Sequence, residues 1–397
     1  MSDAVLVLNS GSSSIKFAVF DISADEPALL CKGLLDEHDS APRLTVNDPS
    51  GHKLHETRRA TTDKDANGLF VDVLDWLDSY LGDKTLAAAG HRVVHGGRDF
   101  VEPVEITDAR IAALDALTPL APLHQRRCLS PIRAIQSLRP DLTQIVCFDT
   151  AFHCSLTPTV RRFAIPRRFE DEGIRRYGFH GLSFEYIASR LAAISPTLYA
   201  KRTVVAHLGN GASLCAMRDG VSLDTTMGLT PLDGLVMGTR CGQIDPGVLL
   251  YLLQERRMPP DELQHLLYNE SGLLGVSGLS ADMRTLLGSD NPAAAEAIDL
   301  FTFRVAQQVA AMASTLGGLE CVVFTGGIGE HSAPIRQKIC DRLGWLGVRI
   351  DASANDRTGT RISAEQGAVD VLVIPTSEEM TIARHCAAKL AELSGER

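Results

Sequence analysis

The sequence predicts an α/β fold in two domains. Its 397 residues exceed what one hydrophobic core usually serves, so we expect two cores. Apolar residues make up 45% and charged residues 22% of the chain, a balance that favours packed domains over disorder. Short β-type runs alternate with segments of helical period, and this alternation is typical of layered α/β proteins.

The predicted strands are short apolar runs. Ala4–Leu8 and Ile15–Phe20 are joined by a small polar segment from Asn9 to Ser14, which predicts strand, loop, strand rather than strand, loop, helix. Further strands are expected at residues 89–94, 144–148, 203–207, 321–325 and 369–374.

A repeated pattern within the chain predicts that the first strand-loop-strand segment is duplicated. The interval from Gly11 to Asp21 recurs from Gly209 to Asp219, again as apolar run, small-residue loop and apolar run. We expect a boundary near Asp149–Ser155, with an N-terminal domain at 1–150 and a C-terminal domain at 151–380. The helix of about 380–397 is expected to pack back on the N-terminal domain.

The sequence predicts the N-termini of two helices. Asp245 is a capping acceptor before a proline at the first helical position, ahead of Val248–Gln254. The segment Thr376–Glu379 fits a capping box that opens a helix running to about Leu393. The carboxylates in that first turn also have an ordinary reason to be there, because they complement the helix dipole.

Charge and cysteine content limit the partners. The formal net charge of −10 argues against nucleic acid or an anionic membrane, since both need an extended basic surface. Nine cysteines without a CxxC pair indicate reduced thiols. No basic leader and no apolar run of about 18 residues is present, so we expect a cytoplasmic protein without a membrane partner.

Three glycine-rich segments follow predicted strands. Phosphate groups need converging backbone N–H donors, which glycine and serine allow. Asn9–Lys16, His207–Ser213 and Thr325–Glu330 qualify as such loops. A single loop of this kind is more often a turn than a site, but three in one chain favour phosphate binding. The chain has no Gly-Lys pair for a Walker loop, and neither later loop has the third glycine of the dinucleotide fingerprint.

The first two loops lie inside longer motifs. Val5–Lys16 and Val204–Leu214 resemble the two signatures of the acetokinase family, in the same order. Other segments that resemble the family are residues 90–97, 148–153, 177–181, 237–240 and 375–379. The resemblance therefore extends over nearly the whole chain.

The resemblance implies two actin-like, ribonuclease H-like domains of duplicated topology with an interdomain active-site cleft. It implies an ATP:acetate phosphotransferase that moves a phosphoryl group reversibly between ATP and acetate, giving acetyl phosphate and ADP by direct in-line displacement. Mg²⁺ is the expected metal, with Mn²⁺ as a substitute, and ATP or ADP is the co-substrate. A cytoplasmic homodimer is expected from the family.

The resemblance also assigns catalytic roles. Arg92 and Arg240 would hold the substrate carboxylate and the equatorial phosphoryl oxygens, a task suited to the guanidinium fork. Asp149 corresponds to the acid that orients or activates the attacking carboxylate, and His180 to the group that stabilises the transition state. His124 is a lesser catalytic candidate.

Binding residues follow from the same resemblance. Asn9 and Glu378 correspond to magnesium positions and offer hard oxygen ligands. The substrate site would comprise Arg92 with the apolar residues Val94, Leu123, Phe179 and Pro231. The nucleotide would be bound by Lys16, His207, Leu208, Gly209, Asn210, Gly211, Asp282, Met283, Arg284, Gly327, Ile328, Gly329, Glu330 and His331.

Each of these residues also has an ordinary structural interpretation. An arginine is more often structural than catalytic, a carboxylate after a strand is often a turn acceptor, and a histidine among apolar residues is often a core residue. Glu378 could serve only the helix start. The sequence departs from the family pattern at Gln125–Cys128, Gln243 and His331, which leaves one edge of the substrate pocket and the nucleotide contacts open.

Two other functions compete with acetate kinase. A propionate or other short-chain carboxylate kinase would use the same chemistry, and one branched side chain in the pocket discriminates by only ~1–3 kcal/mol. A non-kinase actin-like ATPase module would need the phosphate loops but would have no use for Arg92 and Arg240. Formation of an acyl phosphate distinguishes the kinases from the module.

Overall fold

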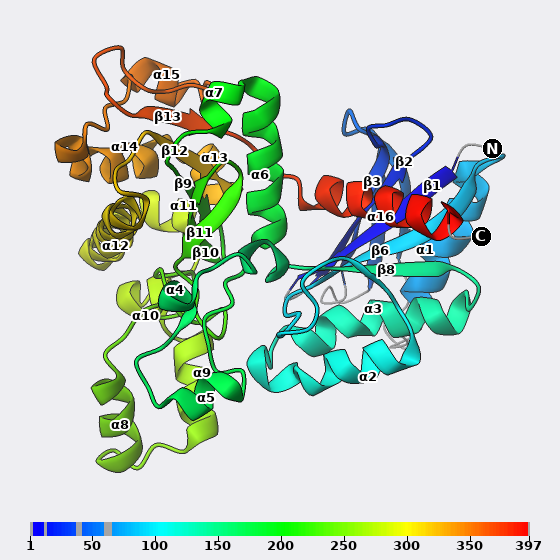
Figure 1. The fold of residues 1–397 in the computed structure, drawn as a ribbon, viewed down its shortest axis with the longest axis horizontal. Helices are drawn as coiled ribbons and strands as arrows, with labels where there is room; N and C mark the ends of the chain where they lie inside the picture. The colour runs from blue at the N-terminus through cyan, green and yellow to red at the C-terminus, as the bar shows by residue number, and fades with distance from the viewer. Residues whose placement is uncertain (1–2, 12–13, 37–41, 59–65, 396–397) are drawn as a thin grey trace. The chain divides into compact units, whose positions relative to one another are not determined.

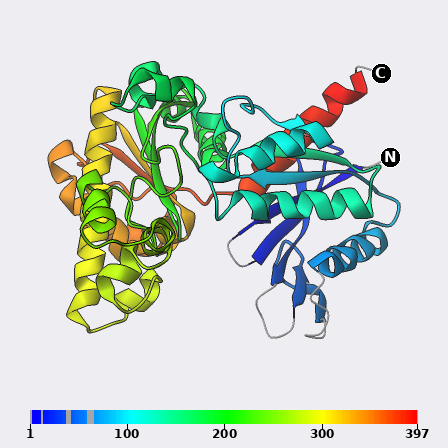
Figure 2. The same ribbon diagram turned by 90° about the horizontal axis from the view of Figure 1, so that it is seen from below.

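The computed structural model describes residues 3–11, 14–36, 42–58 and 66–395. The chain divides into two compact units (Figure 1). Unit 1 comprises Met1–Ala151 and Ser377–Arg397, and unit 2 comprises Phe152–Thr376. The chain thus leaves unit 1 after Ala151 and returns to it at Ser377 with the last helix, whose red ribbon packs on the blue and cyan strands in Figures 1 and 2.

Unit 1 contains one sheet with the strand order β5-β4-β3-β2-β1-β6-β8-β7. Strands β1 and β2 pair in antiparallel fashion, with Val5 opposite Phe20, which confirms the predicted hairpin. Strands β1, β6 and β8 run parallel to one another. The strands are β1 (Asp3–Ser10), β2 (Ser14–Asp21), β3 (Ala28–Asp36), β4 (Arg43–Asn47), β5 (Lys53–Arg58), β6 (Thr85–Val93), β7 (Val104–Glu105) and β8 (Thr143–Phe148).

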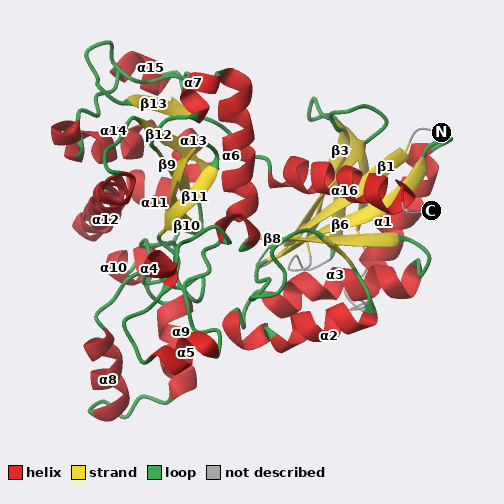
Figure 3. Cartoon of the chain, viewed as in Figure 1, coloured by secondary structure: helices red, strands yellow, loops and turns green. Residues whose placement is uncertain are grey.

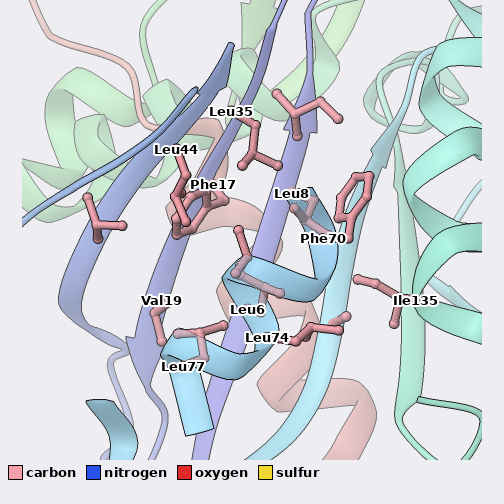
Figure 4. Packing of buried hydrophobic residues seen from close by; sticks show 14 of the residues in the cluster. Leu6, Leu8, Phe17, Val19, Leu35, Leu44, Phe70, Leu74, Leu77 and Ile135 are labelled. Carbon is pink, nitrogen blue, oxygen red and sulfur yellow. The ribbon is translucent and has the colours of Figure 1, made fainter. Parts of the chain in front are cut away.

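Helices cover both faces of this sheet. Side chains alternate between the faces of a strand, so Leu6 and Leu8 of β1 point to one face, where they pack with Leu74 and Leu77 of a helix (Figure 4). On the other face, Gly90 of β6 lies against the last helix. The helices are α1 (Ala66–Leu81), α2 (Asp108–Ala116), α3 (Gln125–Leu138) and α16 (Glu378–Gly395), with a 3₁₀ turn at Thr118–Leu120.

Unit 2 contains a five-stranded sheet with the order β11-β10-β9-β12-β13. The first three strands are antiparallel neighbours, and β9, β12 and β13 are parallel. This is the order and orientation of β3-β2-β1-β6-β8 in unit 1, which confirms the predicted duplication. The strands are β9 (Thr203–Leu208), β10 (Ala212–Arg218), β11 (Val221–Thr225), β12 (Cys321–Thr325) and β13 (Asp370–Val373) (Figure 3).

Two long helices pack on the sheet of unit 2. Phe184 and Leu191 of α6 share a core with Val205 and Val323 of the sheet, and α12 packs on β10, β11 and β9. The helices are α4 (Pro158–Arg161), α5 (Arg167–Asp171), α6 (Gly181–Ile194), α7 (Pro196–Tyr199), α8 (Pro246–Gln254), α9 (Pro260–Asn269), α10 (Gly272–Ser277), α11 (Met283–Leu287), α12 (Pro292–Leu316), α13 (Gly326–His331), α14 (Ala333–Arg342) and α15 (Ala352–Asp356), with 3₁₀ turns at Ala151–His153 and Gly344–Leu346. Among the described residues, no helix is both long and apolar enough to cross a membrane.

The helix starts confirm one prediction and correct another. The Asp245 carboxylate accepts from the Gly247 N–H at 2.9 Å, as expected for an N-cap. At α16 the capping acceptor is Ser377, whose hydroxyl accepts from the Met380 N–H at 3.4 Å, and not Thr376. The Thr376 hydroxyl is instead 2.9 Å from that of Ser183.

Two of the predicted loops are shorter than expected. Asn9 and Ser10 are the last residues of β1, and Ser14 is the first of β2. The third glycine cluster is not a loop, because residues from Gly326 onward form α13 directly after β12. The chain turns into this helix at Gly326, where φ is +76° and a Cβ would lie 2.8 Å from the Leu208 carbonyl oxygen, so glycine is required.

Candidate active site

Three parallel strands of unit 1 end in polar residues. Asn9 lies near the end of β1, Arg92 near the end of β6, and Asp149 directly after β8. Since β1, β6 and β8 are parallel neighbours, their carboxyl ends meet at one edge of the sheet, the edge at which open α/β sheets bind ligands. Glu378 reaches the same residues from the first turn of α16.

Arg92 is the centre of this group. Its Nε donates to one carboxylate oxygen of Asp149 at 2.9 Å and its Nη2 to the other at 2.6 Å, which is a bidentate fork. Its Nη1 donates to the Asn9 side-chain oxygen at 3.1 Å, and Nε lies 3.4 Å from a Glu378 carboxylate oxygen. The Asn9 amide nitrogen donates to Glu378 at 3.0 Å and to Glu379 at 3.3 Å.

The charges of this group keep Arg92 protonated. Burial by itself lowers the pKa of the guanidinium, but the carboxylates of Asp149 and Glu378 outweigh that effect and raise the pKa of Arg92 well above its ordinary value. The group contains three carboxylates, those of Asp149, Glu378 and Glu379, but only one guanidinium. The surplus of negative charge suits a divalent cation.

The donor types also fit magnesium. Carboxylate and amide oxygens are hard ligands, and Mg²⁺ is usually held by one or two carboxylates with several waters and substrate phosphates. Among the described residues, no cluster of three or more His, Cys, Asp or Glu side chains forms an all-protein metal cage. The two predicted metal residues, Asn9 and Glu378, are brought together, although the Asn9 oxygen accepts from Arg92 in this arrangement.

Other predicted residues of unit 1 lie in varied surroundings. Val94 is buried, whereas 39% of the Leu123 surface is exposed. His124 is partly buried at the start of α3, and Lys16 is an exposed residue of β2, opposite Asn9 of β1.

The departure at Gln125 has a structural explanation. Gln125 is fully buried, and its amide nitrogen donates to the carbonyl oxygens of His95 and Leu114. Its side-chain oxygen accepts from the His95 N–H at 3.2 Å. Gln125 therefore satisfies buried backbone groups of His95 and Leu114, whereas Arg126 and Arg127 are exposed.

The predicted residues of unit 2 converge on the turn between β9 and β10. This turn is closed by a hydrogen bond of 2.9 Å from the Gly209 N–H to the Gly211 carbonyl oxygen. A Cβ on Gly211 would lie 2.8 Å from Nη2 of Arg240 and 3.2 Å from Nε2 of His180. A side chain at position 211 would therefore displace the end of Arg240 or the ring of His180.

His180 is held in an unusual conformation. Its φ of 57° and ψ of 24° lie in the left-handed region, which disfavours a residue with a side chain. Its Nδ1 is 2.8 Å from the Ser213 hydroxyl, and its ring stacks on His207 at a centroid distance of 4.3 Å. His207 is fixed in turn by Ser183, at 2.8 Å from Nδ1.

His153 is a positioning residue that the sequence analysis missed. Its Nε2 donates to the Phe179 carbonyl oxygen at 3.0 Å, so Nδ1 must accept from the Ser222 hydroxyl at 2.8 Å. Burial lowers the pKa of His153 to about 4, which keeps the ring neutral. His153 thus fixes the backbone immediately before His180. No local sequence pattern joins these residues, which are 26 positions apart.

The predicted substrate residues of unit 2 contribute in different ways. The Phe179 side chain is 1% exposed and belongs to the core of the unit. The Pro231 carbonyl oxygen accepts from Arg240 Nη1 at 2.6 Å, so Pro231 orients the guanidinium.

The predicted nucleotide residues occupy α11, α13 and the β9–β10 turn. Asp282 caps α11 by accepting from the Thr285 N–H at 2.9 Å, Met283 is buried, and Arg284 is exposed. In α13, the Glu330 carboxylate accepts from the backbone N–H groups of Gly326 and Thr376 at 2.8 and 3.1 Å.

Two further predicted nucleotide residues of α13 are His331, whose side chain is exposed, and Gly327, beside which there is room for a side chain. The side chain of His331 is 77% exposed. A Cβ on Gly327 would meet nothing within 4 Å, and one on Gly209 would lie 3.9 Å from the Gly327 nitrogen. Open space therefore adjoins the start of α13 at Gly327, which lies near the turn.

Known proteins resemble this chain over nearly its full length. The profile of the Acetokinase family matches residues 4–384. An acetate kinase of Rhodopseudomonas palustris (strain TIE-1) is 50% identical over 392 residues, which cover 97% of this chain and 98% of the relative.

Solved structures share the fold. A propionate kinase from Francisella tularensis has a TM-score of 0.88 and 37% identity, and the match covers 96% of this chain and 98% of the other. An acetate kinase from Porphyromonas gingivalis has a TM-score of 0.85 and 34% identity, with 98% and 100% coverage.

Proposed function

Because the chain belongs to the acetokinase family, we propose that it transfers a phosphoryl group reversibly between ATP and acetate, giving acetyl phosphate and ADP. The observation that carries this proposal is the guanidinium of Arg92, held by Asp149, Asn9 and Glu378 where three parallel strands end. Among the described residues, three of the five N–H groups of this partly buried guanidinium are used in these contacts, so two remain to bind a planar carboxylate or phosphoryl oxygens.

In unit 1, Arg92 and Asp149 would act on the carboxylic acid. Arg92 binds and orients the anion, and Asp149 holds the guanidinium in a fixed plane and directs the attacking carboxylate oxygen. Asn9 and Glu378 would hold Mg²⁺, and the bound metal would neutralise the phosphate oxygens. Mn²⁺ would serve as a substitute with the same oxygen ligands.

In unit 2, Arg240 and His180 would stabilise the phosphoryl group in the transition state of its transfer. Both side chains adjoin Gly211, and both are oriented before substrate binds, Arg240 by Pro231 and His180 by Ser213. Preorganised donors stabilise developing charge without reorganising during the reaction. The nucleotide would lie along the β9–β10 turn and α13, with α11 beside it.

Two measurements test the reaction and its substrate. With ATP, Mg²⁺ and acetate, trapping with hydroxylamine should give acetohydroxamate in proportion to the ADP formed. Release of free phosphate without hydroxamate would refute the kinase and support an ATPase module.

The choice of acid is tested by kcat/KM for acetate, propionate and butyrate. The likeness to a propionate kinase makes this comparison necessary. We expect acetate to be preferred, because Val94, two positions after Arg92, is a buried branched residue that would narrow the pocket. A higher kcat/KM for propionate would assign the protein to its alternative, a short-chain carboxylate kinase.

We also propose a cytoplasmic homodimer. None of the nine cysteines, all of which the structure describes, forms a disulfide, as expected of thiols in a reducing compartment. Helix α8 has the apolar sequence PGVLLYLLQ but no buried residue, and Leu250 and Tyr251 are 53% and 55% exposed. An apolar helix of this kind favours a protein interface. Sedimentation equilibrium should give twice the mass of the chain, and Leu250→Glu should lower it to that of the monomer; a monomeric wild type would refute the dimer.

A further inference from the structure

Arg336 of α14 is a buried cation outside the groups described above. It has no exposed surface and is the largest of the fully buried side chains in the described part of the chain. Its Nη1 donates to the carbonyl oxygens of Gly329 and Glu330 at 2.9 and 2.8 Å. Its Nε and Nη2 donate to the side-chain and backbone oxygens of Asn355 at 2.7 and 2.8 Å.

All of these acceptors are neutral. Within the described residues, no carboxylate lies within ion-pair distance of Arg336, and Asp356, whose carboxylate acts on it at longer range, is exposed. Burial lowers the pKa of Arg336. A buried charge without a charged partner is costly, and amide oxygens compensate its desolvation only in part. No neutral side chain has enough N–H donors for these four oxygens, so the guanidinium has a structural role, and its positive charge can act on groups beyond them.

The position of Arg336 places this charge at α13. It is bonded to the last turn of α13, while Gly326 at the first turn of α13 packs against Leu208 at the end of β9. The only carboxylate bonded to α13 among the described residues is Glu330, which faces the Gly326 and Thr376 N–H groups. An anion beside this helix would meet the negative charge of Glu330 unless a cation offset it.

We propose that Arg336 is the buried counter-charge for the phosphates of the nucleotide, and so helps the site to prefer ATP over uncharged nucleosides. The proposal rests on the nucleotide position proposed above. Arg336 does not touch the phosphates; it acts through the field across α13, which is weakly screened because the side chain is buried. Its effect must therefore scale with the charge of the ligand, unlike that of a purely structural clamp.

The variant Asn355→Asp separates charge from structure. It retains Arg336 and an acceptor for Nε, and it adds a carboxylate that neutralises the guanidinium. It also removes the hydrogen bond from Asn355 Nδ2 to the Ala333 carbonyl oxygen, a structural loss that should affect ATP and adenosine alike. We expect the Kd of ATP, measured by titration calorimetry at pH 8, to rise about tenfold, that of ADP to rise less, and that of adenosine to change by less than about twofold. Arg336→Lys, which keeps the charge and loses the fork, should shift the Kd values of ATP and adenosine by similar factors.

Two outcomes would overturn the proposal. If Asn355→Asp changes the Kd values of ATP and adenosine equally, or changes neither, Arg336 is only a structural clamp. Should Asn355→Asp fail to fold, Arg336→Gln with the same ligands decides between the same outcomes.

A separate variant tests the nucleotide position itself. Gly327→Ala adds a methyl group to open space, so it should block the nucleotide without disturbing the fold, whereas Gly344→Ala, also in open space, is its control. If Gly327→Ala binds ATP and adenosine like the wild type, the proposed position is wrong. If it weakens both ligands while Asn355→Asp weakens neither, the position stands and only the role of Arg336 fails.

Discussion

The two units use one strand order for two kinds of chemistry. In unit 1 the parallel strands β1, β6 and β8 end in Asn9, Arg92 and Asp149, a group rich in charge. In unit 2 the corresponding strands β9 and β12 end in the Leu208–Gly211 turn and in Gly326. In both units the topology brings the carboxyl ends of the parallel strands to one edge of the sheet. The residues at that edge decide whether it presents charged side chains, as in unit 1, or glycine-rich backbone, as in unit 2.

The side chains at the two sheet edges are also held in place by different interactions. In unit 1, Arg92 is fixed by direct ion pairing with Asp149. In unit 2, His180 is fixed through neutral neighbours, namely Ser213, stacked His207, and the Phe179 carbonyl oxygen held by His153. Substitutions in unit 1 should therefore alter charge first, and substitutions in unit 2 should alter geometry first.

The largest effect is expected from the two arginines. Arg92→Ala and Arg240→Ala should each lower kcat/KM for acetate by about 10³-fold, because each removes a preorganised cation from the reacting groups. Lysine should restore little at Arg92, since a point charge cannot copy the fork with Asp149. Steady-state rates check this, with the exposed Arg139→Ala as control; a loss below tenfold at either arginine would remove it from the reaction.

Buried histidines provide the next comparison, one in each unit. Burial lowers the pKa of both His91 and His153 to about 4, from an ordinary value of 6.5. The unfolded chain therefore binds more protons between these values, so stability is full above pH 6.5 and falls as pH drops toward 4, by up to about 3 kcal/mol for each residue.

Urea unfolding at pH 7.5 and pH 5 measures this loss. His91→Gln and His153→Gln should each reduce the difference between the two pH values, whereas exposed His331→Gln should not. A wild type equally stable at both pH values would show that neither ring is kept neutral by burial.

Packing of the last helix distinguishes unit 1 from unit 2. A Cβ on Gly90 of β6 would lie 2.6 Å from Cys386 Sγ and 2.7 Å from Ile382 Cγ2 of α16. Gly90→Ala should therefore lower the free energy of unfolding by about 1–3 kcal/mol through overpacking. Thermal unfolding checks this against Gly344→Ala in unit 2, and equal Tm values for the two variants would contradict the close packing of α16 on β6.

The smallest effect is expected for the metal residues. Glu378→Gln should raise the Mg²⁺ concentration for half-maximal rate by about three- to tenfold, and high Mg²⁺ should restore much of the rate. Glu392→Gln, on the same helix and paired with Lys389, is the control. The same Mg²⁺ dependence in both variants would leave Glu378 as a partner of Asn9 and Arg92 alone.

The sequence by itself determined the local structure and the motifs. Alternating apolar residues predicted the hairpin of β1 and β2 and its duplicate in β9 and β10, because strand period and turn composition are local properties. The N-cap at Asp245 could likewise be predicted from the sequence, since the accepting carboxylate of Asp245 and the donating N–H of Gly247 are two residues apart.

Only the tertiary structure decided which polar groups meet. Thr376 was predicted as a cap, yet its hydroxyl pairs with Ser183, 193 residues away. The third glycine cluster was predicted as a loop, but contact of Gly326 with Leu208 starts a helix there. His153 and Arg336 carry no local signal, because their partners are backbone carbonyl oxygens, which every residue possesses, or side chains 19 or more positions away. Such contacts depend on chain topology, and sequence patterns report only neighbours along the chain.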